Sequence, residues 1–437
     1  MILWTLGHWG VGVSWIIVSV YYYGNIGYVA STITYLIFLF LILLFAVAPL
    51  VLFKREQKQD LSLNSLLFIS SAFIIIELTR DFFFGGFPWL IPGTVLLDTK
   101  LSQIIPLIGA GGASFIIYFI SSLIARYWQT SKLRALLIFI FASFLLIEQS
   151  SQPIKDYDDS ITVRLVQSSL DPKIKQLNKN RSLIEETLIK LSKENSELVD
   201  LIIWPEAELP YAYQSKEYIA LKQKFEQKPK LITGIWHFDD NSLFNALVNV
   251  NNDEIYQKRH LVPFGEYIPF KKALNPILSY FGAPISDISP GEDNQELISL
   301  NSKYKIAPLI CYDIVFGNDV RKTVKSSNFI INISNDAWFG RSLGPYQHLE
   351  ISRIRALENN KWLVRATNDG FSAVIDNKGT IVDFLDKGIQ GSLDSNISTK
   401  NSPTIYALYG YYVPYLFAIF YTIFSLGRFL WLKHRVF

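Results

Sequence analysis

Three residues with complementary chemistry follow strand-like segments of this chain. Cys311 is the only cysteine and ends the apolar run 306–311. Glu206 follows an apolar run that stops at a proline, and Lys258 ends a third strand-like segment. A thiol nucleophile needs a base to take its proton and a positive group to stabilise an oxyanion. The carboxylate of Glu206 and the ammonium of Lys258 could supply both, so the three residues could catalyse attack on a carbonyl carbon.

Each of these residues also has a less specific interpretation. A free cysteine is commonly a small buried hydrophobic residue, and the local sequence favours neither interpretation of Cys311. Glu206 could be an exposed loop glutamate, because Glu208 shows that carboxylates occur there without a special role. Lys258, taken alone, is typical of a surface lysine.

Two neighbours of Lys258 could take part in the same site. Glu266 could hold the ammonium in place, and His260 could activate a thiol, although a histidine beside Arg259 is more often structural. The five histidines of the chain are scattered without the paired spacing of metal ligands. A single cysteine also excludes an intramolecular disulfide.

The composition predicts that these residues belong to a membrane protein. Half of the residues are hydrophobic and only 18% are charged, which exceeds the apolar content of an ordinary soluble enzyme. The apolar runs lie at both ends of the chain and leave a mixed pattern between them. We therefore predict an N-terminal transmembrane domain of about five helices (1–149), a globular catalytic domain (150–408) and a C-terminal transmembrane helix with a tail (409–437).

The charges near the apolar runs predict which side of the membrane the globular domain faces. About six spans are expected, near 2–22, 31–53, 63–79, 104–126, 134–149 and 409–432. The basic residues that cluster beside them are Lys54, Arg55, Lys58, Arg126, Lys132, Arg134, Arg428, Lys433 and Arg435. All lie on one side if the N-terminus is cytoplasmic, so by the positive-inside rule the globular domain lies outside the cytoplasm and the C-terminus inside. The first stretch lacks a basic region and a small-residue cleavage site, so it predicts a span and not a secretory signal.

The pattern between the spans predicts an α/β domain with helices outside sheets. Strands are expected at 161–167, 198–204, 231–236, 246–250, 306–311, 329–334, 362–366 and 373–376, and helices at 173–193 and 345–359. The net charge of +3 and the absence of a basic stripe interleaved with aromatics argue against nucleic acid as a partner.

The order of the motifs resembles that of a known family. Trp-Pro-Glu at 204–206, Lys-x-His-Leu-Val-Pro-Phe-Gly-Glu at 258–266 and Cys-Tyr-Asp at 311–313 resemble the carbon–nitrogen hydrolase (nitrilase) superfamily. Further stretches resemble, more narrowly, the bacterial apolipoprotein N-acyltransferase family: Gly-Phe-Pro-Trp at 86–89, 334–340, 344–348, 355–358 and 365–370. The resemblance covers nearly the whole chain.

This resemblance implies a fold, a reaction and a set of site residues. The fold would be a nitrilase-type α-β-β-α sandwich inserted between transmembrane helices. The enzyme would transfer a fatty acyl group from a phospholipid, through a thioester on Cys311, to the N-terminal amine of the S-diacylglyceryl cysteine of an apolipoprotein. The motif matches imply that Glu206, Lys258 and Cys311 are catalytic. They also imply that Glu266, Tyr312, Asp313 and Trp338 support the site.

The resemblance further implies a monomer without a cofactor in the bacterial inner membrane, with its catalytic domain on the periplasmic side. Two departures stand out: the family commonly has Glu where this chain has Asp313, and its members usually have about two more N-terminal spans. A membrane-tethered amidase, a lipoprotein-binding pseudoenzyme and a transporter are the alternatives. The aromatic segments 81–90 and 406–415 could line a lipid entrance or form an ordinary aromatic belt.

Overall fold

The chain forms two compact units in the computed structural model. The structure describes residues 2–22, 27–53, 62–82, 85–148, 159–170, 180–263, 265–267, 288–399 and 402–435. One unit comprises residues 1–14, 32–151 and 403–437, and the other comprises residues 15–31 and 152–402. The basic cluster expected at 54–58 and the first part of the helix expected at 173–193 lie outside the described residues. The domain boundaries at 149 and 408 stay predictions.

The first unit is mainly helical in its described part. Its longer helices contain few charges and many exposed large apolar side chains, as expected of helices that face lipid. They are α1 (Ile2–Gly12), α3 (Gly27–Phe53, which begins in the other unit), α4 (Leu63–Thr79), α5 (Ile105–Thr130), α6 (Lys132–Leu145) and α14 (Tyr412–Arg435). Shorter elements are η2 (Pro92–Leu96), η3 (Ser102–Ile104) and α13 (Ile405–Tyr409).

Among the described residues, two helical segments are long and apolar enough to cross a membrane. They are Gly27–Ala48 and Ser102–Thr130. A third span exists if Leu3–Gly12 and Trp15–Tyr22 count as one, and Leu63–Thr79 is apolar but shorter. Helices therefore occur where the six spans were expected, but length and composition support two or three of them as spans.

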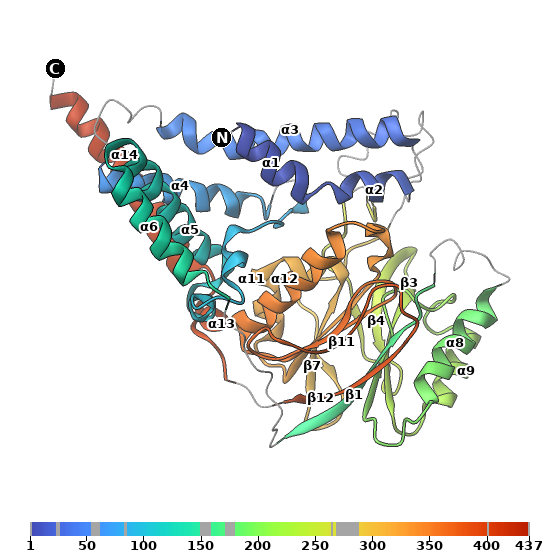
Figure 1. Ribbon diagram of the computed structural model, residues 1–437. Coiled ribbons are helices and arrows are strands. Elements are labelled where there is room, and N and C mark those ends of the chain that lie inside the picture. The colour runs from blue at the N-terminus through green and yellow to red at the C-terminus, as the bar shows by residue number, and fades with distance from the viewer. Residues whose placement is uncertain are drawn as a thin grey trace. The chain divides into compact units, whose positions relative to one another are not determined.

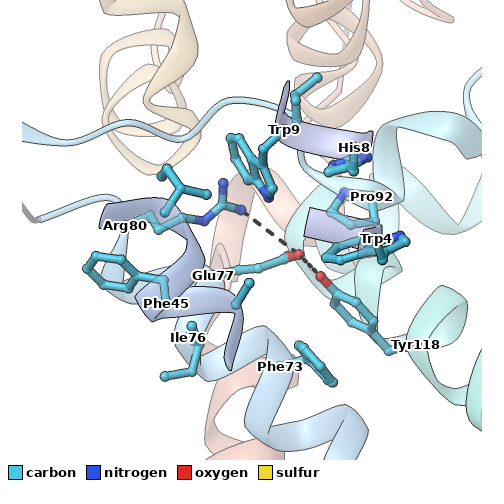
Figure 2. A pocket seen from close by; sticks show the side chains of 13 residues that line it. Trp4, His8, Trp9, Phe45, Phe73, Ile76, Glu77, Arg80, Pro92 and Tyr118 are labelled. Atoms are coloured by element: carbon cyan, nitrogen blue, oxygen red, sulfur yellow. Dashed lines mark hydrogen bonds and ion pairs between the residues drawn. The ribbon is translucent and has the colours of Figure 1, made fainter. Parts of the chain in front are cut away.

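A buried polar cluster lies inside the helical unit and borders a small cavity (Figure 2). Tyr118 donates a hydrogen bond to Glu77, and Arg80 stands 3.9 Å from the same carboxylate. The Arg80 guanidinium also donates to the Trp89 carbonyl oxygen and covers the ring of Trp9. Polar groups within apolar helices are stable when they pair with one another, as these do.

The second unit contains two six-stranded mixed sheets. The first sheet has the order β12-β1-β2-β3-β4-β5, and the second has the order β11-β10-β9-β8-β7-β6. The first sheet consists of β1 (Ser160–Gln167), β2 (Leu201–Ile203), β3 (Lys230–Asp239), β4 (Ser242–Asn249), β5 (Ile255–Gln257) and β12 (Gly391–Ser398). The second sheet consists of β6 (Ile298–Ser299), β7 (Lys305–Ile310), β8 (Phe329–Ser334), β9 (Leu363–Thr367), β10 (Ser372–Ile375) and β11 (Ile381–Leu385).

The two sheets pack face to face between outer helices. Alternate residues of β1 show this arrangement, because Leu165 joins a core shared by both sheets whereas Val166 joins a core beneath helices. The helices α8 (Arg181–Lys193) and α9 (Lys216–Lys224) cover the first sheet (Figure 1). The second sheet contacts α11 (Gly317–Val324) and α12 (Gly344–Asn359). The expected α-β-β-α sandwich is therefore present.

The expected strands and the helix at 345–359 all occur, with ends within four residues of the expected positions. The strand-like segment expected before Lys258 is β5, whereas three strands were not expected: β6, β11 and β12. The short strand β6 carries too little pattern to stand out, and β12 alternates polar residues that resemble a loop. Residues 15–22, expected within the first span, group with the sandwich, where α2 (Trp15–Tyr22) bonds to Trp338 and Gln347.

Candidate active site

The ends of three strands bring the predicted catalytic residues into one site. Glu206 leaves β2 in a turn that lies directly on β3, where Gly234 donates a backbone hydrogen bond to the Pro205 carbonyl oxygen. A Cβ atom on Gly234 would lie 2.5 Å from that oxygen, so only glycine permits this approach. Lys258 follows β5, and Cys311 follows β7 of the opposite sheet. The site therefore lies where both sheets end.

Lys258 lies between two carboxylates. Its Nζ donates to Oε1 of Glu206 at 3.0 Å and to Oε1 of Glu266 at 2.9 Å. The Lys258 side chain is 1% exposed, so the interpretation as a surface lysine is wrong. Glu206 is buried too, which also rules out an exposed loop glutamate.

Polar contacts hold both carboxylates in place. The Asn245 side-chain amide donates to Oε1 of Glu206 at 2.7 Å, and the Asn335 backbone N–H donates to Oε2 at 2.8 Å. Oε2 of Glu266 accepts from the Val262 backbone N–H. Each Glu206 oxygen therefore has a donor, and the carboxylate has one orientation.

Burial and charge set the proton affinities of the cluster. Burial opposes the charged form of Lys258, but Glu206 and Glu266 outweigh it and raise the pKa of the ammonium well above its usual value. Burial also raises the pKa of Glu206, with a contribution from Glu266, while Lys258 lowers it. Lys258 thus stays cationic, and Glu206 becomes a stronger base than an exposed carboxylate.

Cys311 has an unusual backbone conformation and a protonated thiol. Its φ is +46°, a left-handed value that non-glycine residues adopt rarely and mainly at functional sites. The residue packs against the core between the sheets but keeps intermediate exposure. Burial raises the pKa of the thiol, Glu206 raises it further, and Lys258 opposes this rise. The thiol therefore needs a base to become a nucleophile.

Asp313 is one of the residues expected to support the site. Asp313 is fully buried, where it accepts from the backbone N–H groups of His260 and Ile310 and from the Tyr256 hydroxyl. It therefore ties the lysine segment to the strand that carries the cysteine.

The two predicted aromatic residues differ in exposure. Tyr312 is buried edge-on to Phe316, whereas Trp338 is 44% exposed, with its carbonyl oxygen bonded to Ser19. Of the aromatic segments assigned to a lipid entrance or a belt, Trp89 and Tyr406 are buried within the helical unit and act in packing.

Sequence reasoning missed several residues beside the three predicted catalytic residues. Asn245 is a buried amide within an otherwise apolar stretch of β4, a signal that could have been noticed. Asn335, Asp336 and His348 lie in motifs that marked the family but received no role. His260, considered as an activating base, bonds to Asp319 and stacks on Phe316. Within the described residues, no group of His, Cys, Asp or Glu could hold a metal ion.

Comparison with known proteins identifies the family of the chain. The family model for carbon–nitrogen hydrolases matches residues 162–401, and the model for the apolipoprotein N-acyltransferase N-terminal domain matches residues 1–123. The apolipoprotein N-acyltransferase of Photobacterium profundum is 30% identical over 439 residues, with 95% of this chain and 84% of the relative covered. The chain belongs to the apolipoprotein N-acyltransferase family.

The chain is also similar to other known proteins. The apolipoprotein N-acyltransferase of Pasteurella multocida is 29% identical over 434 residues, covering 93% of this chain and 82% of that protein. A carbon–nitrogen hydrolase superfamily protein of known structure from Xanthomonas campestris is 20% identical, with a TM-score of 0.42, covering 55% of this chain and 91% of that chain. Membership in the apolipoprotein N-acyltransferases supports an acyltransferase with membrane character that acts in lipoprotein biosynthesis.

Proposed function

We propose that this protein transfers a fatty acyl group from a phospholipid to the N-terminal amine of the S-diacylglyceryl cysteine of an apolipoprotein. The observation that carries the proposal is a buried ammonium between two carboxylates, at the strand ends where the single thiol of the chain also lies. This arrangement supplies a base, an oxyanion partner and a nucleophile. Both substrates are lipids, which accounts for a sandwich domain joined to apolar helices.

The first half-reaction would acylate Cys311. Glu206 takes the thiol proton as the sulfur attacks the ester carbonyl carbon, and Lys258 stabilises the oxyanion of the tetrahedral intermediate. The carbon–oxygen ester bond then breaks. Glu206 returns the proton to the departing alkoxide, which leaves as a lysophospholipid. The acyl group remains on the sulfur as a thioester.

The second half-reaction would form the amide. The free amine of the acceptor attacks the thioester carbon, and Lys258 again stabilises the oxyanion. Glu206 takes a proton from the amine and passes it to the departing thiolate, which restores the thiol. Transfer exceeds hydrolysis only if water is kept from the thioester. An amidase with the same triad would pass the acyl group to water instead.

We extend the proposal to the membrane arrangement. The apolar helices would form about six spans, with the sandwich on the periplasmic side of the bacterial inner membrane and the C-terminus in the cytoplasm. The exposed apolar side chains of α3, α6 and α14 support lipid contact. A monomer would suffice, because one chain supplies the base, the ammonium and the thiol.

Intact-mass analysis of the purified protein tests this function. Wild type incubated with phospholipid should gain the mass of one acyl chain in a hydroxylamine-sensitive adduct, and Cys311→Ala should gain none. A diacylated lipopeptide should then discharge the adduct as an amide. Discharge to water alone would indicate an amidase, and the absence of any adduct on wild type would indicate a pseudoenzyme.

A further inference from the structure

A buried polar cluster lies directly behind the nucleophile. His348, on α12, places Nε2 3.3 Å from the carbonyl oxygen of Cys311. Its Nδ1 lies 3.0 Å from Oδ1 of Asp336 and 3.0 Å from Nη2 of Arg365. Arg365 also donates to Oδ2 of Asp336 at 2.7 Å, and the Ser334 hydroxyl donates to Oδ1 at 2.7 Å. The mechanism uses none of these side chains.

The contacts define which nitrogen of His348 carries the proton. The Cys311 carbonyl oxygen can only accept a hydrogen bond, so Nε2 must donate to it. Nδ1 faces both the Arg365 guanidinium, which can only donate, and Oδ1 of Asp336, which can only accept; in a neutral ring with its proton on Nε2, Nδ1 accepts from Arg365. Burial, followed by the charge of Arg365, lowers the pKa of His348, which agrees with a neutral ring. We assign the Nε2–H tautomer from this network.

We propose that His348 is a positioning residue that holds Cys311 in its left-handed conformation, through a hydrogen bond from Nε2 to the Cys311 carbonyl oxygen. The inference rests on the proposed function of Cys311 as the nucleophile. A left-handed φ at a non-glycine residue persists only when neighbouring contacts impose it. Asp313 fixes the backbone before Cys311 through the Ile310 N–H, and His348 fixes the carbonyl of Cys311 itself.

The same cluster links the nucleophile to the base. Asp336 follows Asn335, whose backbone N–H donates to Glu206 at 2.8 Å. Asp336 also contacts His348, so one turn after β8 fixes both the Glu206 carboxylate and the Cys311 carbonyl. A shift of this turn would move the thiol relative to its base. Misplacement by about 1 Å can lower a rate about 100-fold.

Two polar substitutions of His348 separate positioning from packing. The amide of His348→Gln reaches the place of Nε2 and can still donate to the Cys311 carbonyl oxygen. The shorter amide of His348→Asn reaches the place of Nδ1 and keeps only the contacts with Asp336 and Arg365. The matched control is His237→Asn on β3, because its ring bonds to Gln257 and has no place in this cluster.

The experiment measures the rate of acyl adduct formation with phospholipid, the thermal unfolding temperature and the rate at which iodoacetamide alkylates the protein. Because the chain has one cysteine, alkylation reports on Cys311 alone. We expect His348→Asn to lower the acylation rate by about 10- to 100-fold, and His348→Gln to restore most of it. The pH profile of alkylation should change in His348→Asn and stay unchanged in His237→Asn.

Equal acylation rates in both His348 variants, or a loss that follows only the unfolding temperature, would overturn the positioning role. Acylation of wild type is required for this comparison. If wild type forms no adduct, the proposed function fails. If wild type acylates and His348→Asn acylates as fast, the positioning role fails alone.

Discussion

Replacing Glu206 with glutamine should separate two effects that the carboxylate has on Cys311. The carboxylate raises the pKa of the thiol, and it is the base that would take the thiol proton. Glu206→Gln removes one negative charge while Lys258 keeps its bond to Glu266. The thiol should therefore ionise at lower pH, yet acylation should slow by about 100- to 10,000-fold, the usual contribution of a positioned base.

The hydrogen bonds also predict a change in stability. Lys258, Asn245 and the Asn335 N–H all donate to the two Glu206 oxygens. A glutamine offers one oxygen, so its amide nitrogen must face at least one of these donors. A buried donor without an acceptor lowers the free energy of unfolding by about 1–3 kcal/mol.

The assay makes three measurements on each protein. Acyl adduct formation, iodoacetamide alkylation against pH and thermal unfolding are measured for wild type, Glu206→Gln and the control Glu208→Gln. Glu208 is an equally buried carboxylate, and it accepts a hydrogen bond from Ser168. Wild-type acylation by Glu206→Gln would refute the role of Glu206 as base. An alkylation profile that moves to higher pH would refute the electrostatic argument.

Four further outcomes can be checked with the same methods. Lys258→Met should lower acylation by about 100- to 1,000-fold, through loss of the oxyanion partner. It should also lower the unfolding temperature, because the buried Glu206 and the partly buried Glu266 lose their cation; an unchanged temperature would contradict this account. Gly234→Ala should slow acylation although it removes no functional group, because the added Cβ would displace the turn that carries Glu206. The control is Gly427→Ala, whose Cβ would meet no atom within 4 Å. Asp313→Asn should lower the free energy of unfolding by about 1–3 kcal/mol, because three donors then share one acceptor oxygen. In the pH profile of wild-type acylation, the half-maximal rate on the acidic side should lie above pH 4.5, the ordinary pKa of glutamate. Burial raises the pKa of Glu206, and the base works only when it is deprotonated. A half-maximal rate at or below pH 4.5 would contradict a raised pKa of this base.

The parts of the site that the sequence predicts are those attached to strong strands. The runs that end at Glu206 and Cys311 are buried on both faces, so their apolar residues are continuous and their ends are clear. The burial of Lys258 was not predictable from its own segment alone. It depends on Glu266 of that segment and also on Glu206, which lies 52 residues earlier in the chain.

Other features depend on three-dimensional packing that no local pattern carries. Asn245 and Asn335 orient Glu206 from different sheets, and His348 reaches Cys311 from a helix 37 residues further along the chain. The sequence also predicts more spans than the lengths of the helices support, because α4 has only 17 residues and α6 only 14. A helix of that length covers about 21–26 Å at 1.5 Å per residue, less than the hydrocarbon core.

The contribution of both sheets to one site has a consequence for folding. Glu206 and Lys258 follow strands of the first sheet, whereas Cys311 and Asn335 follow strands of the second. A folding intermediate with only one sheet formed would hold a thiol without its base, or a base without its thiol. Activity would therefore begin only after the two sheets have docked, and the nascent chain could not form a thioester prematurely.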